Sequence, residues 1–396
     1  MTNVVIVDGV RSAIGAFGKS LRHTHASDLG GTVLKEAIKR SGVQPEDVEE
    51  AIFGCVGQVG ENAFIARTVA LNAGMPNSST AMTVNRLCSS GLQSIVTASQ
   101  TIKNGDATIV AAGGVETMSQ LPYYVRNTRF GEKKMGDMKM EDGLTLALSD
   151  PFYKYHMGVT AENVVGKFGI TREEQDDFAY DSQKKAAHAI EQGYFKEEIV
   201  PIEVKNGRTT SVFAEDEFVR KEIEREKLAK LPPSFKEGGS VTAANSSGIN
   251  DGAAALILMS EEEAVKRGLK PKMKFINYAV SGVDPAIMGI GPTEAIKKAL
   301  DKAGLSLKDI DLFELNEAFA SQSIAVIREA DLDINKVNVN GGAIAMGHPI
   351  GASGAIITIK LMNEMIRRNV RYGLATLCIG GGQGLAAIFE NLHFSK

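Results

Sequence analysis

Three stretches in the first third of the chain recur in the same order in its last third. The matched pairs are residues 37–49 with 299–311, residues 82–85 with 337–340, and residues 109–114 with 374–381. Each pair is separated by about 260 residues, and repetition at a nearly constant spacing indicates a duplicated structural unit. Two similar halves related by a twofold axis would bring equivalent strand ends, and the loops that follow them, to one shared cleft. The duplication therefore constrains both the fold and the place where function is expected.

The first half alternates strands with helices. Residues 4–7 form an apolar run typical of a strand, and a helix is expected from Ser27 to Gly42, where glycine favours termination. Residues 81–84 are expected to end a buried strand, and residues 108–112 to form a strand that ends at a Gly-Gly pair. This βαβα order predicts a layered α/β fold. With 396 residues, 43% of them hydrophobic, the chain is long enough for two or three compact units.

The regular alternation is interrupted in the middle of the chain. A helix is expected at 161–167, and a second one begins at Thr171, because Glu174 completes a capping box. Residues 220–231 are predicted to be a charged helix or a loop that carries one. The expected organisation is an N-terminal half at 1–119, an inserted loop domain at 120–249, the completion of the first half at 250–271, and a C-terminal half at 272–396.

Cys88 lies between the strand expected at 81–84 and a helix whose apolar positions include Leu92 and Ile95. Backbone N–H groups and the positive end of the helix dipole favour a thiolate at such a turn. The next residues, Ser-Ser-Gly, are small, so a substrate can approach closely. These features are typical of a reactive cysteine, but a buried cysteine that packs as a small hydrophobic residue fits the same stretch.

The second half contributes three candidate groups. Asn316 follows a predicted strand, His348 lies in a glycine-rich loop, and Cys378 precedes a glycine run that starts at Gly380. Taken singly, each has an ordinary structural explanation: a turn-capping asparagine, a structural histidine and a core cysteine. Their joint location at strand ends and loops of the duplicated halves favours a common site. The glycine run also offers backbone N–H groups for an oxyanion.

The chemistry that these groups share is acyl transfer. Cys88 would attack a thioester, and His348 would accept the thiol proton. Cys378 would move a proton on the second substrate. The N–H groups of Cys88 and Gly380, together with Asn316 and His348, could supply two oxyanion holes. A zinc site is the competing interpretation, but the chain has no paired C-x-x-C or H-x-x-x-H spacing, so no metal is expected.

Four motifs together resemble the thiolase family along nearly the whole chain. They are NRLCSSG at 85–91, NEAFA at 316–320, GHPIGASG at 347–354 and CIGGGQG at 378–384. The resemblance implies a thiolase fold of two βαβαβαββ halves in a five-layered α-β-α-β-α sandwich, with a loop domain over the entrance. It also implies that Cys88 is the acylated nucleophile, His348 its activator, Cys378 the acid or base, and Asn316 part of an oxyanion hole.

The resemblance further implies that coenzyme A binds beneath the loop domain. The matching positions are His156, Met157, Arg220, Phe235, Ala243, Ser247, Met288, Ala318 and Phe319. Two neighbours depart from the family pattern, since Phe218 replaces a common histidine and Ala244 a common glycine. The resemblance implies that coenzyme A thioesters are the substrates, so no separate cofactor is expected. Thiolases are usually dimers or tetramers of identical chains, and the methionine-rich stretch near 125–140 resembles a tetramerisation loop.

The expected activity is that of an acetyl-CoA C-acetyltransferase, which condenses two acetyl-CoA to acetoacetyl-CoA and free CoA. His156 and Met157 resemble the short-chain biosynthetic enzymes of the family. Residues 83–96, 113–117 and 280–285 are closer to 3-ketoacyl-CoA thiolases of β-oxidation, which is the main alternative. A decarboxylating ketoacyl synthase would carry a second histidine where Cys378 stands. A non-catalytic protein that binds coenzyme A is a third alternative.

The remaining composition restricts partners and compartment. A net charge of −4 provides no basic surface for nucleic acid. Three cysteines make no disulfide framework, which fits a reducing cytoplasm. No apolar run is long enough to span a bilayer, and no secretory signal is recognised before residue 4, so a cytoplasmic protein is expected.

Overall fold

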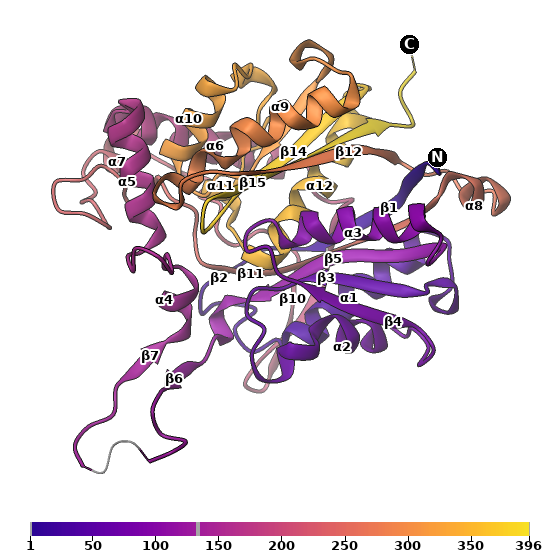
Figure 1. Cartoon of the computed structure of the whole chain (residues 1–396), viewed down its shortest axis with the longest axis horizontal. Coiled ribbons are helices and arrows are strands. Elements are labelled where there is room, and N and C mark those ends of the chain that lie inside the picture. Colours follow the sequence, from indigo (N-terminus) through magenta and orange to yellow (C-terminus); the bar gives the residue numbers. More distant parts are fainter. Residues whose placement is uncertain (1, 132–134, 396) are drawn as a thin grey trace.

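The computed structural model describes residues 2–131 and 135–395 (Figure 1). In this part of the chain the main feature is an eleven-stranded sheet, whose principal order is β13-β14-β15-β12-β1-β11-β5-β3-β4. The first half of the sheet consists of β1 (Val4–Ser12), β2 (Gly15–Ala16), β3 (Glu50–Gly54), β4 (Thr80–Val84), β5 (Ile109–Thr117), β8 (Ile199–Val200) and β11 (Asn250–Ser260). The second half consists of β12 (Met273–Gly282), β13 (Leu312–Leu315), β14 (Tyr372–Ile379) and β15 (Gln383–Asn391).

The halves of the sheet are joined by a short antiparallel contact in which residues 4–6 of β1 pair with residues 273–275 of β12. Two helices, α3 (Ser90–Asn104) and α12 (Ile350–Arg367), pack against each other between the half-sheets. The outer face of the first half is covered by α1 (Ala26–Arg40) and α2 (Ile65–Asn72), and that of the second by α9 (Gly291–Ala303) (Figure 1). The predicted five-layered α-β-α-β-α arrangement is therefore confirmed.

The duplication is visible in local detail. In each half a parallel strand pair, β3 with β5 or β13 with β14, continues into antiparallel neighbours. Both α1 and α9 end beside a glycine in the left-handed region, Gly42 with φ 71° and Gly304 with φ 66°. A single turn of 3-10 helix follows each glycine, at Pro45–Asp47 and Leu307–Asp309, and each turn has a capping box. The repeated sequence therefore encodes repeated helix ends.

The expected burial of the strand at 81–84 is not observed. Residues 81–84 do not form a buried strand, because β4 is the edge of the sheet and Met82 is 39% exposed. The counterpart at 337–340 forms only a single bridge, between Phe313 and Val337, and the chain turns at Asn338, whose φ is 45°. An apolar run indicates a strand but does not reveal whether a neighbour covers its outer edge.

The Gly-Gly pair at 113–114 does not end its strand, since β5 continues to Thr117. A Cβ atom on Gly114 would lie 2.2 Å from the carbonyl oxygen of Gly351. Gly114 therefore allows the backbone of α12 to approach the strand closely, while a Cβ atom on Gly113 would lie 2.2 Å from the carbonyl oxygen of Ala254. Both glycines have a packing role, which resembles a turn signal in the sequence.

The middle segment contains little sheet of its own. Its elements are β6 (Tyr123–Val125), β7 (Met140–Asp142), α4 (Gly143–Ala147), α5 (Met157–Phe168), α6 (Arg172–Glu191), β9 (Ile202–Asn206), β10 (Thr209–Phe213) and α7 (Arg225–Leu228). The capping box of Thr171 and Glu174 at the start of α6 is confirmed. Residues 220–231 form a loop that carries only the four-residue α7. The proposed domain boundaries stay a prediction, and β8 from this segment pairs with β1.

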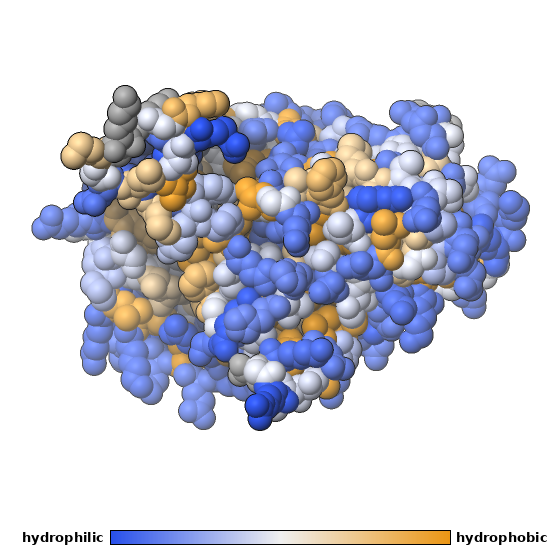
Figure 2. Space-filling model, turned by 90° about the horizontal axis from the view of Figure 1, so that it is seen from below, coloured by the Kyte–Doolittle hydropathy of each residue, from blue (hydrophilic) through white to orange (hydrophobic). Residues whose placement is uncertain are grey.

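Three helices complete the described elements: α8 (Glu261–Lys266), α10 (Ala320–Glu329) and α11 (Ala343–Met346). The hairpin of β6 and β7 projects from the body (Figure 1), and Figure 2 views the molecule from that side. Apolar side chains exposed along the hairpin are Tyr123, Val125, Phe130, Met135, Met138 and Met140. Residues 132–134 of the predicted tetramerisation loop lie outside the described residues. Among the described helices, none is both long and apolar enough to span a bilayer.

Candidate active site

Cys88 occupies a tight turn between β4 and α3. Leu87, just before it, has φ 44°, a left-handed conformation that is uncommon for leucine and is often found at functional sites. The side chain of Asn85 accepts a hydrogen bond from the Leu87 N–H (2.9 Å). Ser90 accepts one from the Arg86 N–H (2.9 Å) and donates one to the Leu87 carbonyl (2.6 Å). Local hydrogen bonds thus hold the cysteine at the start of the central helix.

His348 lies between α11 and α12 and is only 6% exposed. Its backbone N–H donates to the side chain of Asn250 (3.0 Å). Gly347 has φ 113°, and a Cβ atom there would lie 2.4 Å from that same asparagine, so glycine is required. Strand β11, which carries Asn250, and the loop before α12 therefore fix the histidine together.

The tautomer of His348 follows from its neighbour Ser353. The single hydroxyl proton of Ser353 is donated to the carbonyl of Pro349 (2.9 Å), so its oxygen accepts from His348 Nδ1–H (2.6 Å). The Nε2 atom is then unprotonated, and it lies 3.5 Å from the side-chain nitrogen of Asn316. This arrangement leaves Nε2 as the basic atom of the ring.

Burial determines the protonation of the pair at rest. It lowers the pKa of His348 to about 4, so the imidazole is neutral at pH 7. Burial also raises the pKa of Cys88 to about 11, although the Gly380 N–H opposes this effect by donating toward the sulfur. The expectation that the turn favours a thiolate was therefore wrong for the free site, because desolvation outweighs the nearby donors. At pH 7 the free site therefore holds a neutral thiol beside a neutral imidazole.

Cys378 lies one residue before the end of β14 and is completely buried. It packs in an apolar cluster with Met157, Met288 and Phe319. Its pKa is raised well above the ordinary value by burial and by the nearby Cys88. The two cysteines, which are far apart in sequence, are thus neighbours in the fold, as the shared-cleft hypothesis requires.

A cavity of about 400 Å³ opens onto Cys88, His348 and Gly380. Of the predicted site residues, twelve line it: Cys88, His156, Met157, Arg220, Phe235, Ala243, Ser247, Met288, Ala318, Phe319, His348 and Gly380. Asn316 and Cys378 do not line it, but they contact residues that do. The position of these residues agrees with a common site, and their individual roles stay predictions.

Nine lining residues were missed by sequence reasoning: Leu87, Met118, Ala147, Leu148, Phe218, Ser246, Gly248, Ile249 and Ile350. Leu87 and Ile350 belong to motifs quoted above, and Phe218 was noticed only as a departure from the family pattern. The pair Ala147 and Leu148 carries no local signal, because its place in the wall results from the fold of the middle segment.

The cavity wall is mainly apolar and aromatic. The ring of Phe235 stacks on His156 (centroids 4.8 Å apart) and meets Phe319 edge-on at 6.0 Å. His156 caps α5, since its Nδ1 accepts the Gly158 N–H (3.0 Å), and burial lowers its pKa. Arg220 is the single permanently charged residue among the described lining residues. An apolar channel with a cation suits a ligand that has a long neutral arm and an anionic end.

Two buried carboxyl groups hold the loops around the candidate site. Glu116 accepts hydrogen bonds from the N–H groups of Val56, Gly57 and Gly351 (2.8–2.9 Å), which joins the first half to the start of α12. Glu317 accepts from Ser182, Asn338 and the Ile344 N–H. Burial raises the pKa of both groups. Among the described residues, no cluster of three His, Cys, Asp or Glu side chains is placed to bind a metal ion.

The fold and site are those of an acyltransferase of the thiolase type, and the comparisons with known proteins agree. The model of the thiolase N-terminal domain matches residues 4–262, and that of the thiolase C-terminal domain matches residues 269–391. The chain belongs to the thiolase family.

Individual relatives are similar over nearly their whole length. The chain is 52% identical to an acetyl-CoA acetyltransferase of Syntrophomonas wolfei, covering 98% of this chain and 99% of that protein. The crystal structure of the Bacillus anthracis acetyl-CoA acetyltransferase matches with a TM-score of 0.97 and 49% identity, covering 99% of both chains. Human mitochondrial 3-ketoacyl-CoA thiolase in complex with CoA matches with a TM-score of 0.94 and 46% identity, covering 98% of both chains.

Proposed function

We propose that this chain is an acetyl-CoA C-acetyltransferase that condenses two acetyl-CoA to acetoacetyl-CoA and free CoA, and catalyses the reverse thiolysis. The observation that carries the proposal is one apolar cavity onto which Cys88, the basic Nε2 of His348 and the Gly380 N–H converge, with Cys378 beside them. Relatives named acetyl-CoA acetyltransferase, at about half identity, support the short-chain assignment.

In the first half-reaction, Cys88 attacks the thioester carbonyl while its proton passes to His348 Nε2. The carbonyl oxygen becomes an oxyanion that the N–H groups of Cys88 and Gly380 stabilise, and each such donor is worth roughly 3–4 kcal/mol. When the tetrahedral intermediate collapses, the C–S bond to CoA breaks. The departing CoA thiolate takes a proton from Cys378, which leaves acetyl-Cys88, an imidazolium at His348 and a thiolate at Cys378.

In the second half-reaction, the Cys378 thiolate removes a proton from the methyl carbon of a second acetyl-CoA. Its raised pKa makes it a strong base for this weakly acidic C–H group. Asn316 and the imidazolium of His348 stabilise the enolate oxygen. The enolate carbon attacks acetyl-Cys88, the C–S bond breaks, and the Cys88 sulfur recovers its proton from His348. Both cysteines and the histidine return to their starting states.

Coenzyme A would lie along the cavity. The pantetheine arm would run between the His156–Phe235 stack and the segment from Ala243 to Ser247, and Arg220 would face the phosphates. The human relative crystallised with CoA supports coenzyme A as the ligand. The substrates are thus acetyl-CoA, acetoacetyl-CoA and free CoA, and the protein is proposed to act as a homotetramer or dimer.

The alternative is a 3-ketoacyl-CoA thiolase of fatty-acid β-oxidation, which the human relative favours. The test compares kcat/KM for CoA-dependent thiolysis of acetoacetyl-CoA and of a long-chain 3-ketoacyl-CoA. A strong preference for acetoacetyl-CoA is expected. An equal or higher kcat/KM for the long-chain 3-ketoacyl-CoA would instead favour a function in fatty-acid degradation.

A separate measurement tests the covalent chemistry. Incubation with acetyl-CoA alone is expected to add one acetyl group to the peptide that carries Cys88. An adduct confined to Cys378 would reverse the assignment of the two cysteines. The absence of any adduct would favour a protein that binds coenzyme A without catalysis.

A further inference from the structure

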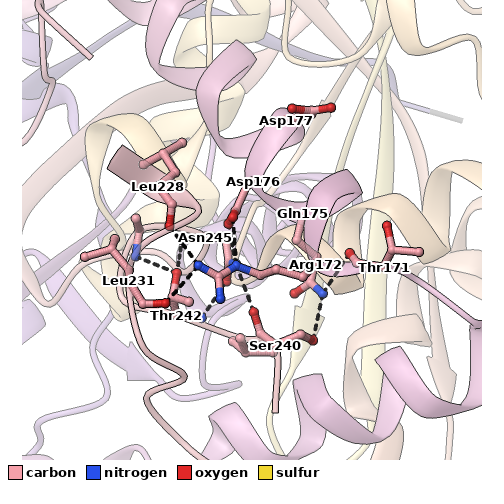
Figure 3. A network of polar contacts seen from close by, with 12 residues as sticks. Thr171, Arg172, Gln175, Asp176, Asp177, Leu228, Leu231, Ser240, Thr242 and Asn245 are labelled. Carbon is pink, nitrogen blue, oxygen red and sulfur yellow. Dashed lines mark hydrogen bonds and ion pairs between the residues drawn. The ribbon is translucent and has the colours of Figure 1, made fainter. Parts of the chain in front are cut away.

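A buried carboxylate outside the cavity is hydrogen-bonded to a residue of the segment that forms one of the cavity walls. Asp176, on α6, is 5% exposed and does not line the cavity. Its Oδ1 accepts a hydrogen bond from the side-chain nitrogen of Asn245 (2.9 Å), and its Oδ2 accepts one from Arg172 Nε (2.7 Å) (Figure 3). Residues 225–248 are called here the strap. Of the two groups that bond the Asp176 oxygens, Asn245 belongs to the strap and Arg172 contacts it.

Asn245 connects this carboxylate with two parts of the cavity wall. The side chain is completely buried, and besides Asp176 it bonds the Ser240 carbonyl (3.2 Å) and the Thr242 N–H (2.8 Å). Its backbone carbonyl accepts the Ala320 N–H (2.9 Å), just after the lining residues Ala318 and Phe319. One asparagine thus ties the strap turn that carries Ala243 and Ser247 to the opposite segment.

Arg172 anchors the beginning of the strap. Its Nη2 donates to the carbonyls of Leu228 (2.7 Å) and Leu231 (2.9 Å), at the end of α7. The same guanidinium neutralises Asp176, so the carboxylate is buried without an unpaired charge (Figure 3). Asp176 and Arg172 therefore fix the strap at both ends, and Phe235 lies between these anchors.

A second carboxylate reinforces the middle of the strap. Glu162 of α5 accepts the N–H groups of Ser240 and Val241 (2.8 Å each). Apart from the short α7, residues 225–248 have no regular secondary structure. A segment of this kind keeps a defined surface only where such bonds hold it, and a preformed wall lowers the entropic cost of binding.

We propose that Asp176 is a positioning residue for coenzyme A thioesters: through Asn245 and Arg172 it holds the strap so that Phe235, Ala243 and Ser247 form a ready wall for the pantetheine arm. The inference rests on the proposed function and deepens it. Asp176 acts at a distance from the reacting atoms, so its loss affects binding of the arm rather than acyl transfer.

The test is Asp176→Asn, with Asp181→Asn as the matched control. Asp181 is an exposed carboxylate of the same helix, α6, and among the described residues it makes no hydrogen bond to the strap. In Asp176→Asn, the new amide cannot accept from both Asn245 and Arg172. The KM for acetoacetyl-CoA and for CoA is expected to rise about tenfold, the effect of losing one charged hydrogen bond, while kcat changes little. The control is expected to match wild type.

A truncated substrate separates positioning from catalysis. Acetyl-N-acetylcysteamine delivers an acetyl thioester without most of the arm, so it should acylate Cys88 equally fast in wild type and Asp176→Asn. Unchanged KM for the CoA substrates would overturn the inference. An equal loss with the full and truncated thioesters would also overturn it, because Asp176 would then act on the reacting groups.

A second variant covers the case in which Asp176→Asn does not fold. Arg172→Lys keeps a cation beside Asp176 but lacks the guanidinium fork that bonds both Leu228 and Leu231, so it should raise KM in the same direction by a smaller factor. Unchanged KM in a folded Arg172→Lys protein would contradict the anchoring. If wild type fails to turn over acetoacetyl-CoA but binds CoA, the proposed function fails, and the affinity of each variant for CoA still tests the positioning role.

Discussion

The most direct test of the catalytic pair is the substitution Ser353→Ala. Ser353 accepts the Nδ1–H of His348 at 2.6 Å and thereby keeps Nε2 free to accept the proton of Cys88. Alanine removes this acceptor, and at 6% exposure the ring has little access to a replacement water. A buried donor without a partner costs about 1–3 kcal/mol. The ring can also change tautomer, which would place the proton on Nε2, the wrong atom.

The loss of this hydrogen bond affects the acylation step in particular. In that step His348 gains a proton, and its Nδ1–H would bond Ser353 more strongly. We therefore expect acylation of Cys88 to slow by about 5- to 150-fold, the equivalent of 1–3 kcal/mol in the barrier. The assay is the pre-steady-state rate at which acetyl-CoA acetylates the Cys88 peptide, followed by mass spectrometry at pH 7. Steady-state KM for CoA should change much less.

The matched control for this experiment lies on the same helix. Thr358 of α12 is fully buried and donates to the Gly354 carbonyl at 2.7 Å, a side-chain bond to the preceding turn like that of Ser353 to Pro349. Thr358→Val therefore removes an equivalent hydroxyl that does not contact His348. If Ser353→Ala acylated at the wild-type rate, or slowed only as much as Thr358→Val, the tautomer and the role of His348 as base would both be refuted.

Three further outcomes are expected. Cys378→Ala should still form acetyl-Cys88 but lose about 10²–10⁴-fold in condensation, and normal condensation would place the base elsewhere. The pKa of His348 is lowered from 6.5 to about 4 in the folded protein, so the unfolded chain binds the proton of this histidine more tightly. The free energy of unfolding, measured by urea titration, should therefore fall by about 2 kcal/mol from pH 7 to pH 5. His348→Asn should not show this loss. Met138→Glu, on the exposed hairpin, should reduce the mass of the oligomer in sedimentation, and an unchanged mass would exclude this hairpin from the subunit contact.

Local signals in the sequence were read correctly where the interaction itself is local. The capping box of Thr171 and Glu174 joins residues three positions apart, and Gly42 ends its helix through its own backbone conformation. The glycine-rich sequence around His348 likewise indicates a loop, and Gly347 in it has a positive φ of 113°. Such features depend on a few consecutive residues, so they can be recognised without knowing the fold.

Other features depend on residues that are distant in sequence. β4 was expected to be buried but lies at the edge of the sheet, since among the described strands it pairs only with β3. Leu148 joins the cavity wall only through the path of the middle segment. Asp176 and Asn245 form a hydrogen bond although they are 69 residues apart in sequence, and no motif near either residue predicts this bond. Patterns along the chain carry no information about which surfaces meet.

From the order of its residues alone, the chain is recognisable as a duplicated α/β protein with two cysteines, one histidine and one asparagine at the ends of repeated elements. That information is local or periodic, so it can be read without knowing the fold. The protonation of the site, in contrast, depends on the folded protein: burial raises the pKa of Cys88 and lowers that of His348, and Ser353 selects the tautomer. Burial depends on the atoms that the whole fold assembles around a group, and for this reason the turn that was expected to hold a thiolate holds a thiol.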